Sequence, residues 1–290
     1  IYAGGPTGLD NFEDTNYDKK EQYSTAYMWY AKEYDNAGLG KLRKYFTKDG
    51  KTNSTVKDLL FYNPEWNTMS DIDLPLDKTF SGKEYASMRS SFYEDSAVFL
   101  GLHGGPVDSA HGHMDNGSFV VDMLGERWAT DIPHDDYSLV NKNLKQQYFL
   151  YRRSPEGHNC LVINPTGESY YQNTSATSLI TNHQSKKRGA FTVLDLSSAY
   201  SDNATSVIRG YRLTSDRRAA EIRDEIKLKA AYDTYWFMQT EADVSISEDG
   251  KSAILEKNGK KVKFMFETDA KEYELTAERP AKPMNVTPKI

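Results

Sequence analysis

Residues 111–131 read HGHMDNGSFVVDMLGERWATD, and this stretch combines a β-hairpin pattern with a dense set of polar side chains. Residues 117–123 and 127–130 are strand-like, and the LGE segment at residues 124–126 is typical of a hairpin turn. Two histidines precede the hairpin and an aspartate ends it. The stretch therefore predicts two antiparallel strands with a polar site where the first strand begins and the second ends.

The alternation of apolar and polar residues continues outward from this hairpin. Further predicted strands cover residues 97–102, 158–163, 191–196, 209–213, 220–229, 234–239, 244–247, 253–256 and 262–267. Asn258 and Gly259, between the last two of these, are a strong hairpin signal. Many short strands joined by polar turns indicate a large antiparallel β-sandwich. We therefore expect a mainly β fold.

The N-terminal quarter of the chain has a different pattern. Residues 19–38 and 54–62 are predicted helices, the first because tyrosines recur in it at helical spacing. Residues 63–80 contain two prolines and many turn-forming residues and read as a linker. The sequence thus predicts a helical segment with its linker at residues 1–75 and a β domain at residues 76–290.

Composition excludes several classes of protein. A formal net charge of −6 argues against a nucleic-acid binder driven by bulk charge, although a local basic cleft can still bind an anionic substrate. No apolar run approaches the roughly 20 residues of a membrane helix, and no signal peptide is visible. The single cysteine, Cys160, excludes an internal disulfide and fits a buried strand position. Because the first residue is Ile1 and not Met, we expect a piece of a longer protein.

The histidines are concentrated in one part of the chain. In an extended segment residues i and i+2 point to the same side, so His111 and His113 can face one site. The hairpin returns Asp131 towards His113, and His158, at the start of a later strand, supplies a third protein ligand and leaves one position for water. Two imidazoles and a carboxylate favour zinc over magnesium or calcium. The sequence therefore predicts Zn²⁺ bound by His113, Asp131 and His158.

Asp115 has two interpretations. Its carboxylate can accept a hydrogen bond from a ligand histidine, or it can cap the turn before residues 116–117. We expect the first role, as a partner of a ligand. His103 and His134 are reserve candidates for the metal site.

Two familiar metal motifs fit this stretch poorly. A metallo-β-lactamase-like HxHxDH motif needs a histidine after the aspartate, but Asn116 follows Asp115. A cupin HxH motif needs a glutamate a few residues later, where this chain has Gly117 and Ser118.

The HxHxDxGSF run at residues 111–119, followed at distance by His158-Asn159, resembles the heparinase II/III-like polysaccharide lyases. Other stretches similar to that family are FSGKEYASMRSSFYEDSAVFLGLHGG (80–105), YRRSPEGHNCLVIN (151–164), GYRLTSDRRAAEIRDEI (210–226) and YWFMQTEADVSI (235–246). The resemblance extends over roughly residues 55–267. It implies an α/α toroid followed by a β-sandwich, and residues 1–62 have room for only the last helices of such a toroid.

The resemblance also implies roles for individual residues. His113, Asp131 and His158 match the family's zinc ligands, and His111 matches a histidine that faces the substrate cleft and takes part in catalysis. The family's catalytic tyrosine lies on the toroid, most of which is missing from this chain. The implied reaction is β-elimination at a uronic acid in an acidic polysaccharide, and the implied location is secreted, periplasmic or at the cell surface.

Five further residues are candidates for substrate binding. Tyr137, Tyr148 and Tyr151 lie between two predicted ligands and can stack on sugar rings, although packing explains them equally well. Arg89 and Arg152 can pair with carboxylate or sulfate groups, because a guanidinium matches planar oxyanions. Arg89 can equally hold the site in shape.

Two other functions remain open. The chain can be a non-catalytic carbohydrate-binding or structural β module that its metal only stabilises. It can also be a metal-dependent hydrolase or oxygenase with a site of two histidines and one carboxylate. Formation of an unsaturated sugar product distinguishes the lyase from both. Heparin-like, hyaluronan-like, chondroitin-like and alginate substrates all fit the lyase interpretation.

Overall fold

The computed structural model describes residues 4–5, 8–9, 12, 26–40, 56–67, 75–108, 111–132, 147–166 and 171–279. Contacts divide the chain into two units, one formed by Ile1–Tyr17 with Asp77–Ile290 and the other by Asp18–Leu76. The sequence places the boundary one residue earlier, at 75/76, and assigns the first residues to the helical segment. The contacts group Ile1–Tyr17 with the β unit instead.

The smaller unit is helical. Its described elements are α1 (Ala26–Glu33), α3 (Val56–Phe61) and the 3₁₀ helix η1 (Pro64–Asn67). Met28, Ala31, Ala37 and Trp66 form its buried core. No helix among the described residues is both long and apolar enough to cross a membrane.

The predicted helix at residues 19–38 is wrong at its C-terminal end. Asp35 has a positive φ of 45°, which ends the helix after residue 33. The Asn36 side chain then accepts hydrogen bonds from the backbone N–H groups of Gly38 and Leu39, at 3.0 and 3.3 Å, and so caps a new helical turn. The predicted linker at residues 63–80 is also partly structured, since it contains η1 and the first strand of a sheet.

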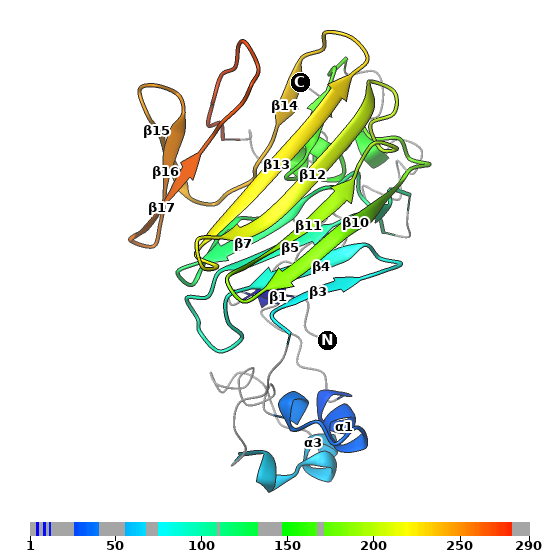
Figure 1. The fold of residues 1–290 in the computed structure, drawn as a ribbon, viewed down its shortest axis with the longest axis vertical. Coiled ribbons are helices and arrows are strands. Elements are labelled where there is room, and N and C mark those ends of the chain that lie inside the picture. The colour runs from blue at the N-terminus through cyan, green and yellow to red at the C-terminus, as the bar shows by residue number, and fades with distance from the viewer. Residues whose placement is uncertain are drawn as a thin grey trace. The chain divides into compact units, whose positions relative to one another are not determined.

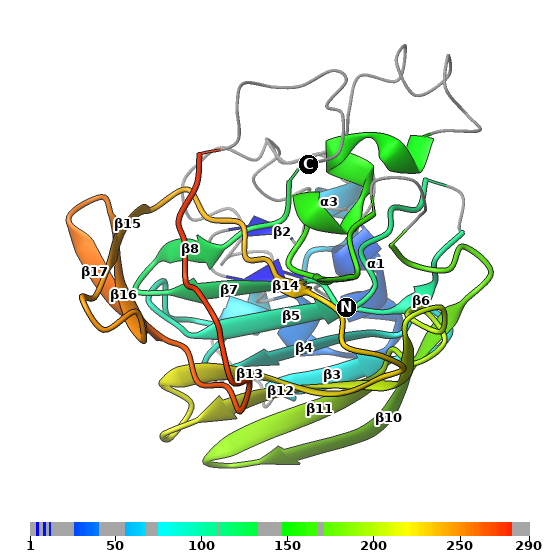
Figure 2. The same cartoon turned by 90° about the horizontal axis from the view of Figure 1, so that it is seen from above.

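The larger unit is an antiparallel β-sandwich, which confirms the predicted mainly β fold. One sheet has the order β3-β4-β5-β7-β8 and the other the order β13-β12-β11-β10-β6. Figure 2 shows β10 to β13 as one layer that lies against the layer formed by β3, β4, β5 and β7. The strands of the first sheet are β3 (Asp77–Phe80), β4 (Tyr85–Arg89), β5 (Phe99–His103), β7 (Phe119–Met123) and β8 (Glu126–Ala129). Those of the second are β6 (Gly105–Pro106), β10 (Thr177–Lys186), β11 (Gly189–Asp195), β12 (Ala204–Thr214) and β13 (Ala219–Leu228).

The core lies between these two sheets. Leu100 and Phe119 of one sheet and Leu194, Val207 and Tyr211 of the other belong to a single buried cluster. Burial alternates along β11 and β12, as a half-buried strand requires. The sequence does not reveal β10, because most of its side chains are polar and exposed and the strand lacks an apolar face of its own.

Smaller elements complete the β unit (Figure 1). They are β1 (Gly4–Gly5), β2 (Gly8–Leu9), η2 (Gln147–Phe149), η3 (Tyr151–Arg153), η4 (Pro155–Gly157), β9 (Leu161–Ile163), β14 (Thr234–Trp236), β15 (Asp243–Ile246), β16 (Ser252–Lys257) and β17 (Lys260–Met265). The two predicted hairpin turns are confirmed. Leu124 and Gly125 join β7 to β8, and Asn258 and Gly259 join β16 to β17, with positive φ at all four residues.

A buried ion pair connects the β12–β13 turn to β3. Arg217 contacts both carboxylate oxygens of Asp77, at 2.7 and 2.6 Å, and also donates to the backbone carbonyls of Arg89 and Lys186. Both members of the pair are buried. A guanidinium that satisfies a carboxylate and several carbonyls fixes the geometry of the segments that supply them.

Candidate metal centre

The loop that leads into β7 carries two of the candidate metal-binding residues, and several hydrogen bonds hold it in place. The backbone N–H of Met114 donates to the carbonyl of Arg153 at 2.9 Å, and Gly117 donates to the carbonyl of His103 at 2.9 Å. The buried Asn116 side chain donates to the Gly105 carbonyl at 2.8 Å. These partners come from three other segments, so the loop has a defined backbone position.

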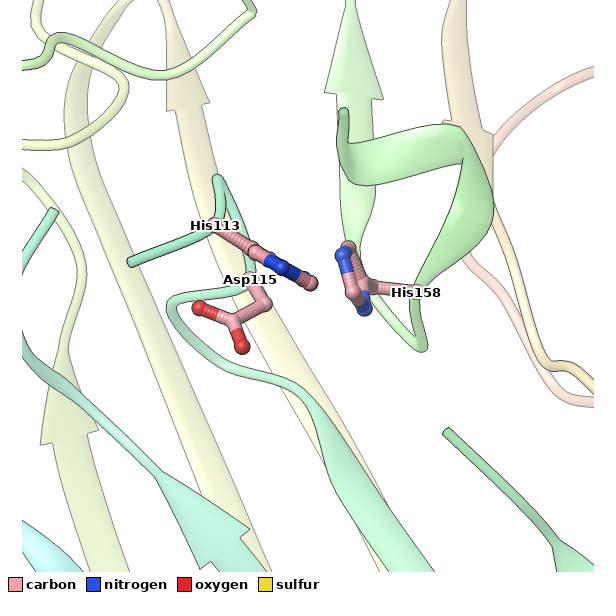
Figure 3. A group of neighbouring side chains, drawn as sticks. All are labelled: His113, Asp115 and His158. Atoms are coloured by element: carbon pink, nitrogen blue, oxygen red, sulfur yellow. The ribbon is translucent and has the colours of Figure 1, made fainter. Parts of the chain in front are cut away.

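Three side chains form a group that could hold a metal ion. His113 and Asp115 come from this loop, and His158 follows η4. One ligand atom from each lies within 4.8 Å of those from the other two, and all three residues are buried. Figure 3 shows the two imidazoles turned towards each other with the carboxylate beside them.

Asp131 lies against His158 from the end of β8. Its Oδ1 is 2.6 Å from Nδ1 of His158, and its Oδ2 accepts a hydrogen bond of 2.5 Å from Ser118. Burial lowers the pKa of His158, but the Asp131 carboxylate outweighs this effect and raises the pKa above its ordinary value. A histidine that binds a metal through one ring nitrogen commonly donates a hydrogen bond from the other ring nitrogen to such a carboxylate.

Asp115 is held by a histidine on the other side. His103 Nε2 lies 3.5 Å from Asp115 Oδ1, and the ring of Phe12 stacks on His103. Burial alone raises the pKa of Asp115, but attraction to His103, and less strongly to His158 and His113, brings it far below the ordinary range. Asp115 is therefore ionised, as a metal ligand must be.

The donor set fits a borderline divalent metal. Nε2 of His158 is buried and has no hydrogen-bond partner among the residues that the structure describes. A buried polar atom in that position is costly unless something binds it. Two imidazoles and a carboxylate suit zinc better than calcium or magnesium, which prefer oxygen ligands.

The structure groups the two carboxylates differently from the sequence. The sequence names Asp131 as the third ligand and Asp115 as its neighbour, whereas Asp115 lies in the group of three and Asp131 contacts His158. The two histidines, His113 and His158, are common to both arrangements. Which carboxylate binds an ion stays a prediction.

His111 lies at the surface next to this buried group. Its side chain is exposed, whereas Gly112 and His113 after it are buried. Its φ of 69° is in the left-handed region, which is unusual for a residue other than glycine. Arg153 donates a hydrogen bond of 3.1 Å to the Gly112 carbonyl and so fixes the peptide between Gly112 and His113. The position suits a side chain that meets an external ligand.

The predicted substrate-binding residues lie in different surroundings. Tyr148 is buried in the sandwich core, and its hydroxyl donates to Asp108 at 3.1 Å. Arg89 is also buried, with its guanidinium against the rings of Phe92 and Phe99. Burial at both positions favours a role in packing over direct contact with a substrate.

Tyr151 and Arg152 are half-buried on η3, directly before the Arg153 that contacts the metal-site loop. Burial raises the pKa of Tyr151. Tyr137, and the reserve candidate His134, lie outside the described residues.

Sequence reasoning missed several residues that hold the site. Asn159, next to His158, is fully buried and donates from its side chain to the carbonyls of Phe119 and Thr130, at 2.5 and 2.8 Å. Ser118 contacts Asp131, and Arg153 contacts Gly112. Of these three, only Asn159 directly follows a candidate ligand in the sequence, whereas Ser118 and Arg153 are brought to the site by the fold.

Comparison with known proteins identifies the family of this chain. The family model described as heparinase II/III-like, C-terminal, matches residues 77–286. The chain belongs to the heparinase II/III-like family. The match covers the whole described β-sandwich, including the metal-site loop, β7, β8 and His158. Membership places the chain in a family of polysaccharide lyases.

Solved structures of similar fold are longer than this chain. The heparinase III-BT4657 gene product has 17% sequence identity and a TM-score of 0.61, over 88% of this chain and 35% of its own. The heparan sulfate lyase HepC from Pedobacter heparinus has 13% identity and a TM-score of 0.60, over 87% of this chain and 35% of its own. The chain therefore spans about a third of the length of these structures. No curated protein sequence matches it.

Proposed function

We propose that this chain is the C-terminal part of a lyase that cleaves a uronic-acid-containing polysaccharide by β-elimination. One observation supports this most directly: an exposed histidine, His111, adjoins a buried group of two histidines and a carboxylate in a domain of a lyase family. The helical unit, residues 18–76, would be the end of an α/α toroid. A secreted, periplasmic or cell-surface location follows from a polymeric substrate of this kind.

The reaction makes specific demands on the protein. A base must remove the proton at C5 of the uronate, which is weakly acidic until the charge of the neighbouring carboxylate is neutralised. An acid must then protonate the oxygen that leaves C4. An imidazole suits either task, because its proton affinity lies near working pH. We assign His111 to the substrate side, where it neutralises the carboxylate or assists proton transfer.

A zinc ion would have a structural role in this proposal. His113 and His158 would hold it with one carboxylate, Asp131 or Asp115. When bound, it would cross-link the loop before β7 to the segment before β9. The exposed neighbour His111 would thereby keep a fixed position relative to the sandwich.

The sugar-binding surface would lie around η3. Tyr151 and Arg152 are half-buried there, close to the loop that carries His111. We propose that they, with Tyr137, contact the polysaccharide. Tyr148 and Arg89 would support this surface through packing, since both are buried.

Substitution of the two carboxylates tests how the ion would be held. Asp131→Asn and Asp115→Asn preserve shape and remove the charge. The variant that has lost a ligand is expected to lose nearly all zinc affinity, and the variant that has lost a supporting carboxylate to lose about 10- to 100-fold. Competition with a zinc chelator measures both. Full affinity in both variants would contradict the proposed centre.

The lyase activity itself has a direct test. A longer protein that joins this chain to a complete toroid is expected to release unsaturated uronate products, which absorb ultraviolet light, from at least one of heparan sulfate, hyaluronan, chondroitin sulfate and alginate. New reducing ends without unsaturation would indicate a hydrolase. Binding of a polysaccharide without any cleavage would indicate a carbohydrate-binding module.

A further inference from the structure

A fully buried arginine lies where the two segments of the metal centre meet. Arg209, on β12, has no exposed surface, although arginine is rarely buried completely. Its side chain points into the sandwich with Val207, Tyr211 and Leu213, which alternate along the same strand. A charge in this position must be compensated by fixed partners.

One guanidinium nitrogen of Arg209 joins the two segments. Nη1 donates to the carbonyl of Gly117 at 2.9 Å and to the carbonyl of Asn159 at 2.8 Å. Gly117 belongs to the loop that carries His113 and Asp115, and Asn159 follows His158 directly. Two hydrogen bonds from the same atom therefore link the two ligand-bearing segments, in addition to the contact of the Asn159 side chain with Phe119.

The orientation of Arg209 is itself fixed. Its Nε and Nη2 contact the two carboxylate oxygens of Asp224 on β13, at 2.7 and 2.9 Å. The indole N–H of Trp236 donates to the same carboxylate at 3.1 Å. Tyr211 adds a second hydrogen bond, of 2.8 Å, to the Gly117 carbonyl. A paired, planar guanidinium directs its remaining donors in one direction only.

The turn that Arg209 contacts requires a glycine, Gly117. Its φ of +93° is in a region that side chains rarely adopt, and a Cβ there would lie 2.8 Å from Leu196 and 3.6 Å from Nη1 of Arg209. A side chain here would therefore strain the backbone and press against Leu196, whereas its distance from Arg209 would be an ordinary contact. Glycine at this position thus lets the turn keep the conformation in which its carbonyl accepts from Arg209.

We propose that Arg209 is a positioning residue of the metal centre, which sets the affinity for the ion by holding the Gly117 and Asn159 carbonyls, and with them His113 and His158, at the correct separation. The inference rests on the proposed metal binding of this group. Lysine cannot replace this arginine, because one ammonium cannot pair with Asp224 and also reach two carbonyls in the required directions. If Arg209 only stabilised the fold, its replacement would not reduce zinc affinity more than replacement of another buried, paired arginine.

Arg217 provides a matched control for burial and pairing. It is also buried, contacts both oxygens of an aspartate, Asp77, and donates to backbone carbonyls. Its partners lie on β3, β4 and the β10–β11 turn, and none adjoins His113 or His158 in sequence. R217K therefore imposes a comparable change on the sandwich without touching the metal-bearing segments.

The experiment compares R209K with R217K in the full chain. Zinc dissociation constants are measured by chelator competition, and amide hydrogen exchange is measured in the metal-free proteins. R209K is expected to bind zinc about 10- to 100-fold more weakly, with faster exchange at the amides around Gly117 and Asn159. R217K is expected to stay within about twofold of the unsubstituted chain, because distant sites act independently.

Each outcome decides the inference. Equal zinc affinity in R209K and the unsubstituted chain would overturn the positioning role and leave the metal centre intact. Absence of zinc binding in the unsubstituted chain would overturn the metal centre, and this inference with it. If R209K does not fold, Y211F, which removes only the second hydrogen bond to Gly117, is expected to weaken zinc binding about two- to tenfold. Unchanged affinity in that variant would then overturn the role.

Discussion

Replacement of His158 by alanine is expected to abolish tight zinc binding by this chain. Its ring is fully buried, with Nε2 lacking a partner among the described residues and Nδ1 2.6 Å from Asp131. Structural zinc sites bind with about 10–16 kcal/mol shared among their ligands, so loss of one ligand is expected to reduce affinity by at least about a thousandfold. His113→Ala should have the same effect. Elemental analysis of the purified variants and chelator competition measure both.

A third histidine variant controls for the loss of an imidazole as such. His183, on β10, is half-buried and pairs with Thr192 at 2.9 Å, away from the group of three. His183→Ala is expected to retain one zinc per chain with unchanged affinity. Unchanged zinc content in His113→Ala or His158→Ala would remove the ligand assignment, and equal loss in all three variants would show a nonspecific effect on folding.

The hairpins and the sandwich could be predicted because their signals are local. Leu124-Gly125 and Asn258-Gly259 both adopt positive φ, and alternation along β11 and β12 reports which face is buried. The sequence does not predict β10, because most of its side chains are polar and exposed and no apolar face alternates along it. The helix breaks at Asp35 and Asn36 because the Asn36 side chain binds a backbone N–H group that would otherwise continue the helix. The spacing of apolar residues does not predict such a cap.

The metal centre could be predicted only in part. Spacing identifies His113 and His158, but the orientation of Asp115 and Asp131 depends on distant contacts, such as that of Asn116 with Gly105. These contacts have no local signature. Arg209 could have been noticed in the sequence, because it lies on the same inward-facing side of β12 as Val207 and Tyr211. A charged residue on the apolar face of a strand indicates a buried network, and here that network ends at the two segments that carry the candidate ligands.

Replacement of His111 is expected to preserve zinc binding and to reduce turnover strongly in the proposed longer lyase. The side chain of His111 is exposed, while the candidate ligands beside it are buried. General acid–base groups typically contribute about 10²- to 10⁴-fold to rate, so kcat for β-elimination should fall by that factor in His111→Ala. Zinc content measured on the same sample separates a catalytic loss from a collapsed site.

The backbone at this position decides which variant is most informative. At φ 69° the backbone is in the left-handed region, which asparagine and histidine tolerate better than alanine does. His111→Asn therefore keeps the loop and removes only the group that carries charge or transfers a proton. Loss of turnover in both variants, with zinc retained and His183→Ala fully active, is the expected pattern. An active His111→Asn would mean that the left-handed backbone is what the site requires, and that the imidazole has no part in the chemistry.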